Sequence, residues 1–490
     1  MENVSVFVRK KLTMDKYFSQ VKIVTPNNIS KLLKISARAV ITSVELVNNF
    51  LLVNGKIVAN AVYLNDEYNI ENTETTVDFV EKQKINSVLS ELVAEDEIEV
   101  QAVNFSSSEV VLSLAHSTKI TGVYRYLLAD AKKADEMLVL NKKDINISSY
   151  KLSNEDNFVV AEEVETNLKN IKVLNTESYA VLSSVVCAVD KVVIEGKVRV
   201  NSLYQEGSNL AEMSKEFEFK QEIAVKNTLP GMSAELVLRH LNTSIVEQGK
   251  DDKNAIAFVI DLSAKVFVFE TMTVETYDDV FSLTNEIVPV YELAEFDEED
   301  GFDFDTDTVL TQTNISNISD FDDIVGVFQP RVNVLEYQDL GEKLMVVSEI
   351  SALALYKTET SIEKLELKYE TKFETTKDLD KHISGISANA VVSAFKVKAG
   401  KDLECAFSVE YKLNYEKRKT DKFVKSYELN QVKEISDAGI KVYVVRENQS
   451  VFDVAKILNV RPELIKAQME VDDYFDAGQK VYVYCPLNIV

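Results

Sequence analysis

The chain has 490 residues, of which 46% are hydrophobic, so it is long enough for about three or four domains with apolar cores. Its 54 basic and 80 acidic residues give a formal net charge of -26, which repels phosphate groups and excludes nucleic acid and anionic lipid as general partners. The cysteines Cys187, Cys405 and Cys485 are too few and too far apart for a disulfide framework, which favours a reducing cytosol.

The first residues of the chain show no targeting signal. Segment 1–20 lacks the apolar core of a signal peptide. No stretch approaches about 18 consecutive apolar residues, the length that a membrane-spanning helix needs. We therefore expect no transmembrane segment and no export by a conventional signal.

Two-residue alternation of apolar and polar side chains dominates most of the sequence. It is clearest at 51–63, 192–201, 257–269 and 346–356. This period is typical of antiparallel strands that have one face on a core and the other in water. The fold class is therefore predicted to be mainly β, with tandem antiparallel β-sheet domains.

Three of these strands are copies of one internal repeat. One face of each presents a branched residue, a small one, a branched one, two mostly small residues and a tyrosine. The three faces are Val53, Gly55, Ile57, Ala59, Ala61, Tyr63; Ile194, Gly196, Val198, Val200, Ser202, Tyr204; and Val346, Ser348, Ile350, Ala352, Ala354, Tyr356. The final tyrosines are 141 residues apart from 63 to 204, and 152 apart from 204 to 356. Such a period is that of a domain, not of a solenoid.

Core packing explains the repeated face without any ligand. The small residues Gly55, Gly196 and Ser348 would let another layer approach closely. The tyrosines would cap the core while their hydroxyls stay in water.

Two charged segments interrupt this pattern. The acidic residues of 295–307 predict a mobile linker over 295–323, and the interleaved Phe296, Phe302 and Phe304 leave a short protein-binding segment as the alternative. The ligand spacing of an EF-hand is missing from it. The basic segment 415–425 is interpreted as the solvated face of a strand hairpin.

The sequence contains no pattern of a catalytic or metal site. The histidines His116, His240 and His382 lie in different copies of the repeat, and no nucleophile, zinc-peptidase, P-loop or dinucleotide motif is present. Carboxylate pairs are expected by chance in a chain this acidic. We predict no catalytic residue, no metal and no cofactor, and therefore a protein that is not an enzyme.

The pattern changes after residue 438. Segment 442–460 predicts a strand, a loop and a helix with Ser450 as its N-cap, and Pro462 begins a second short helix. Segment 477–483 returns as a strand. The order βααβ with this spacing resembles the LysM family over 439–490.

Many LysM modules bind N-acetylglucosamine polymers through two loops. The corresponding loop residues of this chain are Asn448, Gln449, Ser450 and Gln468, where Asn448 and Gln449 replace the usual Gly-Asp and Gln468 stands where Asn is common. These changes favour a protein-docking role over glycan binding. The docking candidates are Lys456, Val460, Arg461 and Ile465.

The whole chain resembles the SPOCS–LysM architecture of clostridial spore-coat morphogenetic proteins. The resemblance rests on segment 194–200 and on Asp279-Val280-Phe281-Ser282. It implies SPOCS-like domains at 1–160 (degenerate), 161–294 (central) and 324–438, followed by the LysM module at 439–490. It also implies a scaffold in the mother-cell cytoplasm at the forespore surface, which binds the sporulation coat ATPase and other coat proteins. Binding of peptidoglycan in the cortex or wall is the alternative function.

Overall fold

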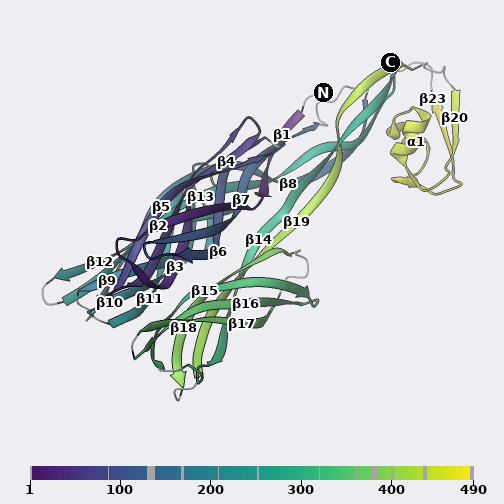
Figure 1. Cartoon of the computed structure of the whole chain (residues 1–490). Coiled ribbons are helices and arrows are strands. Elements are labelled where there is room, and N and C mark those ends of the chain that lie inside the picture. Colours follow the sequence, from purple (N-terminus) through teal and green to yellow (C-terminus); the bar gives the residue numbers. More distant parts are fainter. Residues whose placement is uncertain are drawn as a thin grey trace.

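The structure is a computed structural model of the whole chain. It describes residues 3–86, 88–129, 138–166, 170–207, 209–250, 253–318, 321–359, 361–376, 383–398, 402–433 and 439–485. Antiparallel sheets form most of these ranges, and two short helices lie near the C-terminus (Figure 1). The predicted mainly β fold class is confirmed, including the βααβ order at the C-terminal end.

The first part of the chain forms two packed sheets. One has the order β1-β7-β2, with β6 also paired to β7, and the other has the order β3-β4-β5. The bounds are β1 Asn3–Thr13, β2 Tyr17–Val24, β3 Ile29–Val47, β4 Phe50–Asn65, β5 Ile70–Lys84, β6 Leu89–Phe105 and β7 Glu109–Ala129. Alternate side chains from both sheets meet in one apolar core.

The next two parts repeat this arrangement. The second has sheets β11-β10-β9 and β12-β13-β8, and the third has sheets β15-β16-β17 and β14-β19-β18. The bounds in the second part are β8 Leu138–Thr166, β9 Ile171–Ala188, β10 Lys191–Glu206, β11 Asn209–Ala224, β12 Ser233–Lys250 and β13 Lys253–Ser282. Those in the third are β14 Asn285–Asn314, β15 Phe321–Asp339, β16 Lys343–Thr358, β17 Ile362–Thr376, β18 Ile383–Lys398 and β19 Asp402–Val432. Each part again has its own apolar core.

The repeated sequence corresponds to β4, β10 and β16, the middle strands of the three equivalent sheets. Their repeated faces lie in the cores, where Val53, Ile194 and Val346 are fully buried. The branched side chains fill the space between two sheets, which is why the sequence pattern repeats at the period of a domain.

The small residues of the repeat have a different role from the predicted one. A Cβ atom on Gly55 would lie 2.6 Å from the ring of Phe79, and one on Gly196 would lie 2.7 Å from the ring of Phe219. Both rings belong to the neighbouring strand of the same sheet, directly opposite the glycine in register. The glycines thus make room for a cross-strand phenylalanine, and not for another layer.

The three copies meet in one buried apolar junction. Val62, Leu203 and Leu355, which each precede a repeated tyrosine in sequence, are completely buried in the same cluster. Leu33 and Leu174, which are 141 residues apart, also belong to it. Equivalent residues therefore pack against one another around a common centre, with one contribution from each copy.

Polar contacts surround this junction and join the copies in pairs. Lys34 Nζ lies 3.0 Å from Glu177 Oε1, and Gln329 Nε2 donates to Glu177 Oε1 and to the carbonyl oxygen of Ile35. The amide of Val327 donates to Glu212 Oε2 at 3.2 Å. Burial raises the pKa of Glu212 to about 7. These contacts fix the rotation of the copies about the junction because each needs a specific pair of partners.

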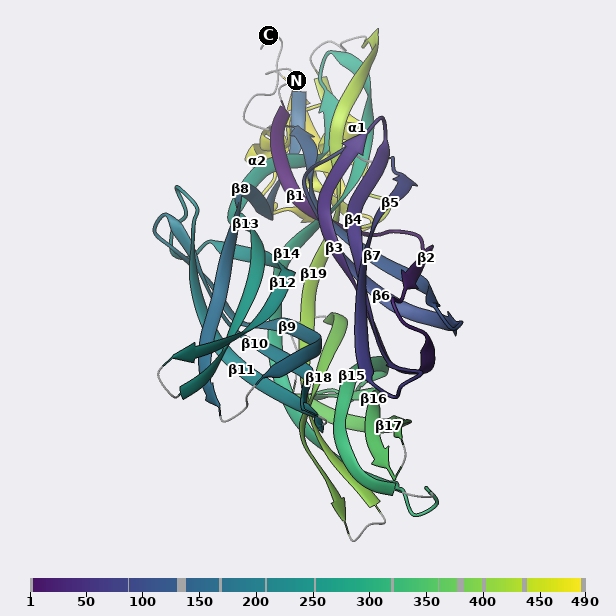
Figure 2. The ribbon, with the colours of Figure 1, turned by 60° about the vertical axis from the view of Figure 1, so that its left-hand side comes forward.

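The strands β8, β13, β14 and β19 have 29 to 31 residues and extend beyond the packed sheets toward the C-terminal helices (Figures 1 and 2). Their extensions contact one another and the first part of the chain through buried residues, among them Ile147, Val274 and Phe423. A second cluster nearer the end contains Tyr277, Val280 and Val424.

The predicted acidic linker is a strand instead. Residues 295–314 belong to β14, which pairs with β19 over most of its length. The register places Phe296 opposite Lys419, Asp297 opposite Arg418 and Glu299 opposite Lys417, so the acidic segment lies along the basic segment 415–425. Opposite charges on neighbouring strands reduce the repulsion that would keep the acidic segment extended and mobile.

Two of the predicted domain boundaries fall inside strands of the structure. The boundary at 160/161 cuts β8, and that at 294/295 cuts β14. The division of the chain into independently folding domains stays a prediction.

The helices and cysteines of the described residues add two findings. Neither helix has the length and apolar composition to cross a membrane. Cys187 and Cys405 are buried free thiols, and Cys485 is a partly exposed free thiol.

We expect Leu203→Ala to destabilise the protein by about 2–5 kcal/mol, because the truncation leaves a cavity where three copies meet. Chemical denaturation of the full chain would measure this. Val186→Ala in the same copy is the control, since Val186 is 55% exposed and its loss should cost less than about 0.5 kcal/mol. Equal stability of the two variants would contradict the importance of the junction.

Candidate docking module

The last described residues form a small module with its own core. It consists of β20 Gly439–Val444, β21 Gln449–Ser450, α1 Val451–Leu458, α2 Pro462–Gln468, β22 Tyr474–Phe475 and β23 Lys480–Cys485. The strands β20 and β23 pair antiparallel, and the two helices lie between them in sequence. Val454, Ala455, Ile465, Val481 and Val483 are fully buried at the centre.

Local signals in the sequence determine where the helices begin and end. Ser450 and Asp453 form a capping box, in which Ser450 Oγ accepts from the amide of Asp453 and the Asp453 carboxylate accepts from the amide of Ser450. Asn459 ends α1 in the left-handed conformation, with φ of 50°. Pro462 occupies the first turn of α2.

The four predicted loop residues form hydrogen bonds inside the module. Asn448 Oδ1 accepts from the amide of Ala477, and Gln449 Oε1 accepts from the hydroxyl of Tyr443. The Gln468 side chain bonds both the amide and the carbonyl oxygen of Tyr484 on β23, at 2.7 and 2.9 Å. These polar groups therefore stabilise the loops, and a sugar would have to compete for them.

The four predicted docking residues differ in exposure. Val460 is 5% exposed and Ile465 is fully buried, so both pack in the core of the module and present no side-chain surface to a partner. Arg461 is exposed at the start of α2. Lys456, on the last turn of α1, faces the long strands.

Lys456 attaches the module to β13. Its ammonium group donates to both carboxylate oxygens of Asp279, at 2.8 and 2.6 Å. Asp279 also accepts from the hydroxyl of Tyr291 at 3.1 Å. The ion pair is partly shielded, since the Lys456 and Asp279 side chains are 39% and 22% exposed.

Apolar and amide contacts continue this attachment. Phe281 is 3% exposed, and its ring meets that of Phe452 edge-on with centroids 5.4 Å apart. Phe281 and its cross-strand partner Val139 belong to the same apolar cluster as the module's own core. Asn459 Nδ2 donates to the carbonyl oxygen of Leu283 at 3.0 Å. The segment Asp279-Val280-Phe281-Ser282 therefore forms much of the contact surface for the module.

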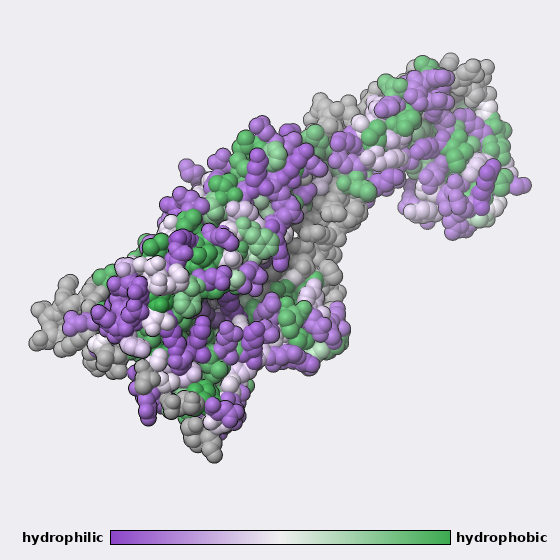
Figure 3. All heavy atoms as spheres, in the orientation of Figure 1, coloured by the Kyte–Doolittle hydropathy of each residue, from purple (hydrophilic) through white to green (hydrophobic). Residues whose placement is uncertain are grey.

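The opposite side of the module presents exposed apolar side chains on β20 and β23. Ile440, Val442, Tyr482 and Tyr484, here called the outer face, are 69%, 55%, 50% and 58% exposed. Ile440 pairs with Tyr484 in register and Val442 with Tyr482, so the four form one continuous patch. Figure 1 shows α1 on the side of the long strands and the two β-strands on the far side. Figure 3 shows apolar surface on the module amid mostly polar surface elsewhere.

The outer face was not identified from the sequence. The alternation at 439–444 indicates a strand, but it cannot tell which face is buried when both faces carry large side chains. A useful signal would have been the alternation in β23, where Val481 and Val483 supply the core and leave the tyrosines outside.

Comparison with known proteins relates the central copy to one family. A family model described as SipL, SPOCS domain matches residues 159–246, which span the end of β8, β9 to β11 and most of β12. The resemblance to SPOCS domains is thereby confirmed for this copy. The family is a structural domain of coat assembly, which associates the chain with the spore coat and its proteins. Comparisons with curated proteins and with solved structures found no match.

We expect Phe281→Ala to loosen the module from β13, because the truncation removes an aromatic side chain that is buried between them and is worth about 3–5 kcal/mol in a core. Hydrogen exchange of the full chain would show faster exchange in α1 and at the end of β13. Val288→Ala, at a 48% exposed position of β14, is the control. Unchanged protection of α1 in the Phe281 variant would contradict the docked arrangement.

Proposed function

We propose that this protein, whose residues 159–246 form a SipL-type SPOCS domain, is a non-enzymatic scaffold of the spore coat that binds the sporulation coat ATPase through its C-terminal LysM-like module. The observation that supports the docking role most directly is the outer face, an exposed patch of two tyrosines and two branched side chains on a small module. Exposed apolar patches rich in tyrosine are typical of protein interfaces.

The architecture suits a scaffold. Three pairs of sheets share a buried junction, and the module is attached at the end of the long strands by the Lys456–Asp279 ion pair and the Phe281–Phe452 contact. A partner bound at the outer face would therefore stay linked to three further surfaces. Linked sites raise the effective concentration of each partner for the next without any new contact.

The predicted docking residues take distinct roles within this proposal. Arg461 contributes charge at the edge of the contact, whereas Val460 and Ile465 act from inside by holding α2 in place. Lys456 sets the orientation of the module through Asp279.

Location follows from the same proposal. A coat scaffold that binds the coat ATPase would act in the mother-cell cytoplasm, at the surface of the forespore. The free thiols Cys187 and Cys405 suit a reducing compartment.

We expect the double variant Tyr482→Ser/Tyr484→Ser to reduce capture of the coat ATPase by at least about tenfold, because interface tyrosines commonly contribute 2 kcal/mol or more. The measurement is affinity capture from sporulating cells with the full chain, followed by titration of the purified ATPase. Tyr474→Ser is the matched control, since Tyr474 is 73% exposed on β22 and lies outside the outer face. Undiminished capture by a chain that ends at residue 438 would refute docking through the module.

Glycan binding is the second candidate, because the module shares the predicted βααβ order of LysM domains. We expect no measurable binding of chitin oligomers to the full chain, since Asn448, Gln449 and Gln468 are occupied in hydrogen bonds within the module. Isothermal titration with purified oligomers would check this. Binding that Asn448→Ala abolishes, with the outer-face variant unaffected, would favour the glycan hypothesis.

A further inference from the structure

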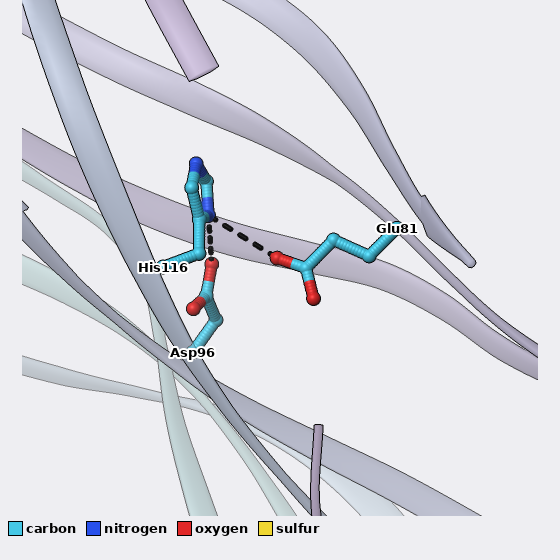
Figure 4. A group of neighbouring side chains, drawn as sticks. All are labelled: Glu81, Asp96 and His116. Carbon is cyan, nitrogen blue, oxygen red and sulfur yellow. Dashed lines mark hydrogen bonds and ion pairs between the residues drawn. The ribbon is translucent and has the colours of Figure 1, made fainter. Parts of the chain in front are cut away.

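Three chemically distinct side chains meet inside the first pair of sheets. Glu81 comes from β5, Asp96 from β6 and His116 from β7, so the group joins one sheet to the other (Figure 4). The side chains of His116 and Asp96 have no exposed surface, and that of Glu81 has 2%. The rings of Tyr17 and Phe79 pack on His116, with centroids 5.1 and 5.0 Å away.

One atom of each side chain faces a common point. His116 Nδ1 lies 2.7 Å from Asp96 Oδ2 and 3.3 Å from Glu81 Oε1, and the three atoms are all within 4.8 Å of one another. A zinc ion about 2.1 Å from each of three tetrahedral ligand atoms would hold those atoms about 3.4 Å apart. A small outward shift of Asp96 is enough to reach that spacing.

The remaining polar atoms are held by hydroxyl groups. Thr118 Oγ1 donates to Glu81 Oε2 at 2.7 Å and to Asp96 Oδ1 at 3.1 Å. Ser19 Oγ lies 2.7 Å from His116 Nε2. When Nε2 carries the proton and donates it to Ser19, Nδ1 presents its lone pair to the carboxylates. Hydrogen bonds of this kind orient the ligands in metal sites of proteins.

The charge of this group is not balanced by the protein. Among the described ion pairs, His116 is the basic partner of both carboxylates. Glu81 Oε1 is buried and has no hydrogen-bond partner. Burial raises the pKa of Glu81, and the nearby Asp96 raises it further. A protonated His116 would still leave one buried negative charge, whereas a divalent cation beside a neutral imidazole would leave none.

We propose that Glu81, Asp96 and His116 bind one divalent transition-metal ion, with zinc as the best match, that links the two sheets of the first copy. One imidazole nitrogen and two carboxylate oxygens are a ligand set that zinc accepts, and a water molecule would complete four-fold coordination. Because all three side chains are buried and no exposed surface is formed, the role of the ion is structural.

The sequence analysis predicted no metal site, since the three ligands are 15 and 20 residues apart and fit no zinc motif. The structure brings them together because β5, β6 and β7 belong to two sheets that face each other. His240, in the second copy, instead lies among the hydroxyls of Ser178 and Thr243. His382 lies outside the described residues.

The test uses the full chain, stripped with a chelator and then dialysed against ZnCl₂ in excess MgCl₂, which occupies the acidic surface. We expect about one tightly bound zinc per chain and a higher unfolding temperature in its presence, because the ion binds only the folded state. Glu81→Gln and Asp96→Asn keep the shape of the side chains and should weaken zinc binding by more than about tenfold. Replacement of the zinc with cobalt should give a visible absorption spectrum that these variants lack.

Two further variants make the outcome decisive even where a ligand substitution disturbs folding. Ser19→Ala removes only the hydroxyl beside Nε2 and should weaken zinc binding by about tenfold while the circular dichroism spectrum is kept. His240→Gln should bind zinc as the unsubstituted chain does. If the unsubstituted chain retains no more zinc than Glu81→Gln and its unfolding temperature does not respond to zinc, the group is a proton-bridged polar cluster and the proposal is wrong.

Discussion

The burial of equivalent apolar side chains from three repeats in one junction is the constraint on which the rest of the structure depends. Val62, Leu203 and Leu355 come from strands more than 140 residues apart, and each is removed completely from water. A buried side chain of this size contributes about 1.5–3 kcal/mol. That attraction opposes the mutual repulsion of copies in a chain with a net charge of -26. The polar contacts around the junction then determine its geometry, because buried charges such as Lys34 require a specific partner.

The position of the C-terminal module follows from this platform. The long strands β13, β14 and β19 leave the packed sheets together, and their ends present Asp279 and Phe281 to α1. Lys456 and Phe452 face these residues, so the side of the module with the helices is covered by the chain itself. What stays accessible is the outer face of β20 and β23. A docking surface on the strands, and not on the helices, is the physical consequence.

The sequence predicted well those features that depend on local pattern. Two-residue alternation identified the strands, the repeat identified the three equivalent middle strands, and Ser450 and Pro462 identified the helix starts. Features that depend on contacts between distant segments were missed. The acidic segment 295–307 looks mobile in isolation, and only the register with 415–425 explains why it forms a strand. Similarly, no spacing rule connects Glu81, Asp96 and His116, because their proximity arises from how two sheets pack.

Because the three copies are parts of one polypeptide, their equivalence is structural but not obligatory. In an oligomer of identical subunits, any substitution appears at every symmetry-related position, so a change useful at one site is imposed on all. Here each copy can diverge alone. The His116 group is confined to the first, the Asp279–Phe281 support for the module to the second, and the acidic and basic strand pair to the third. Tandem duplication thus allows a threefold arrangement to acquire three separate specialisations.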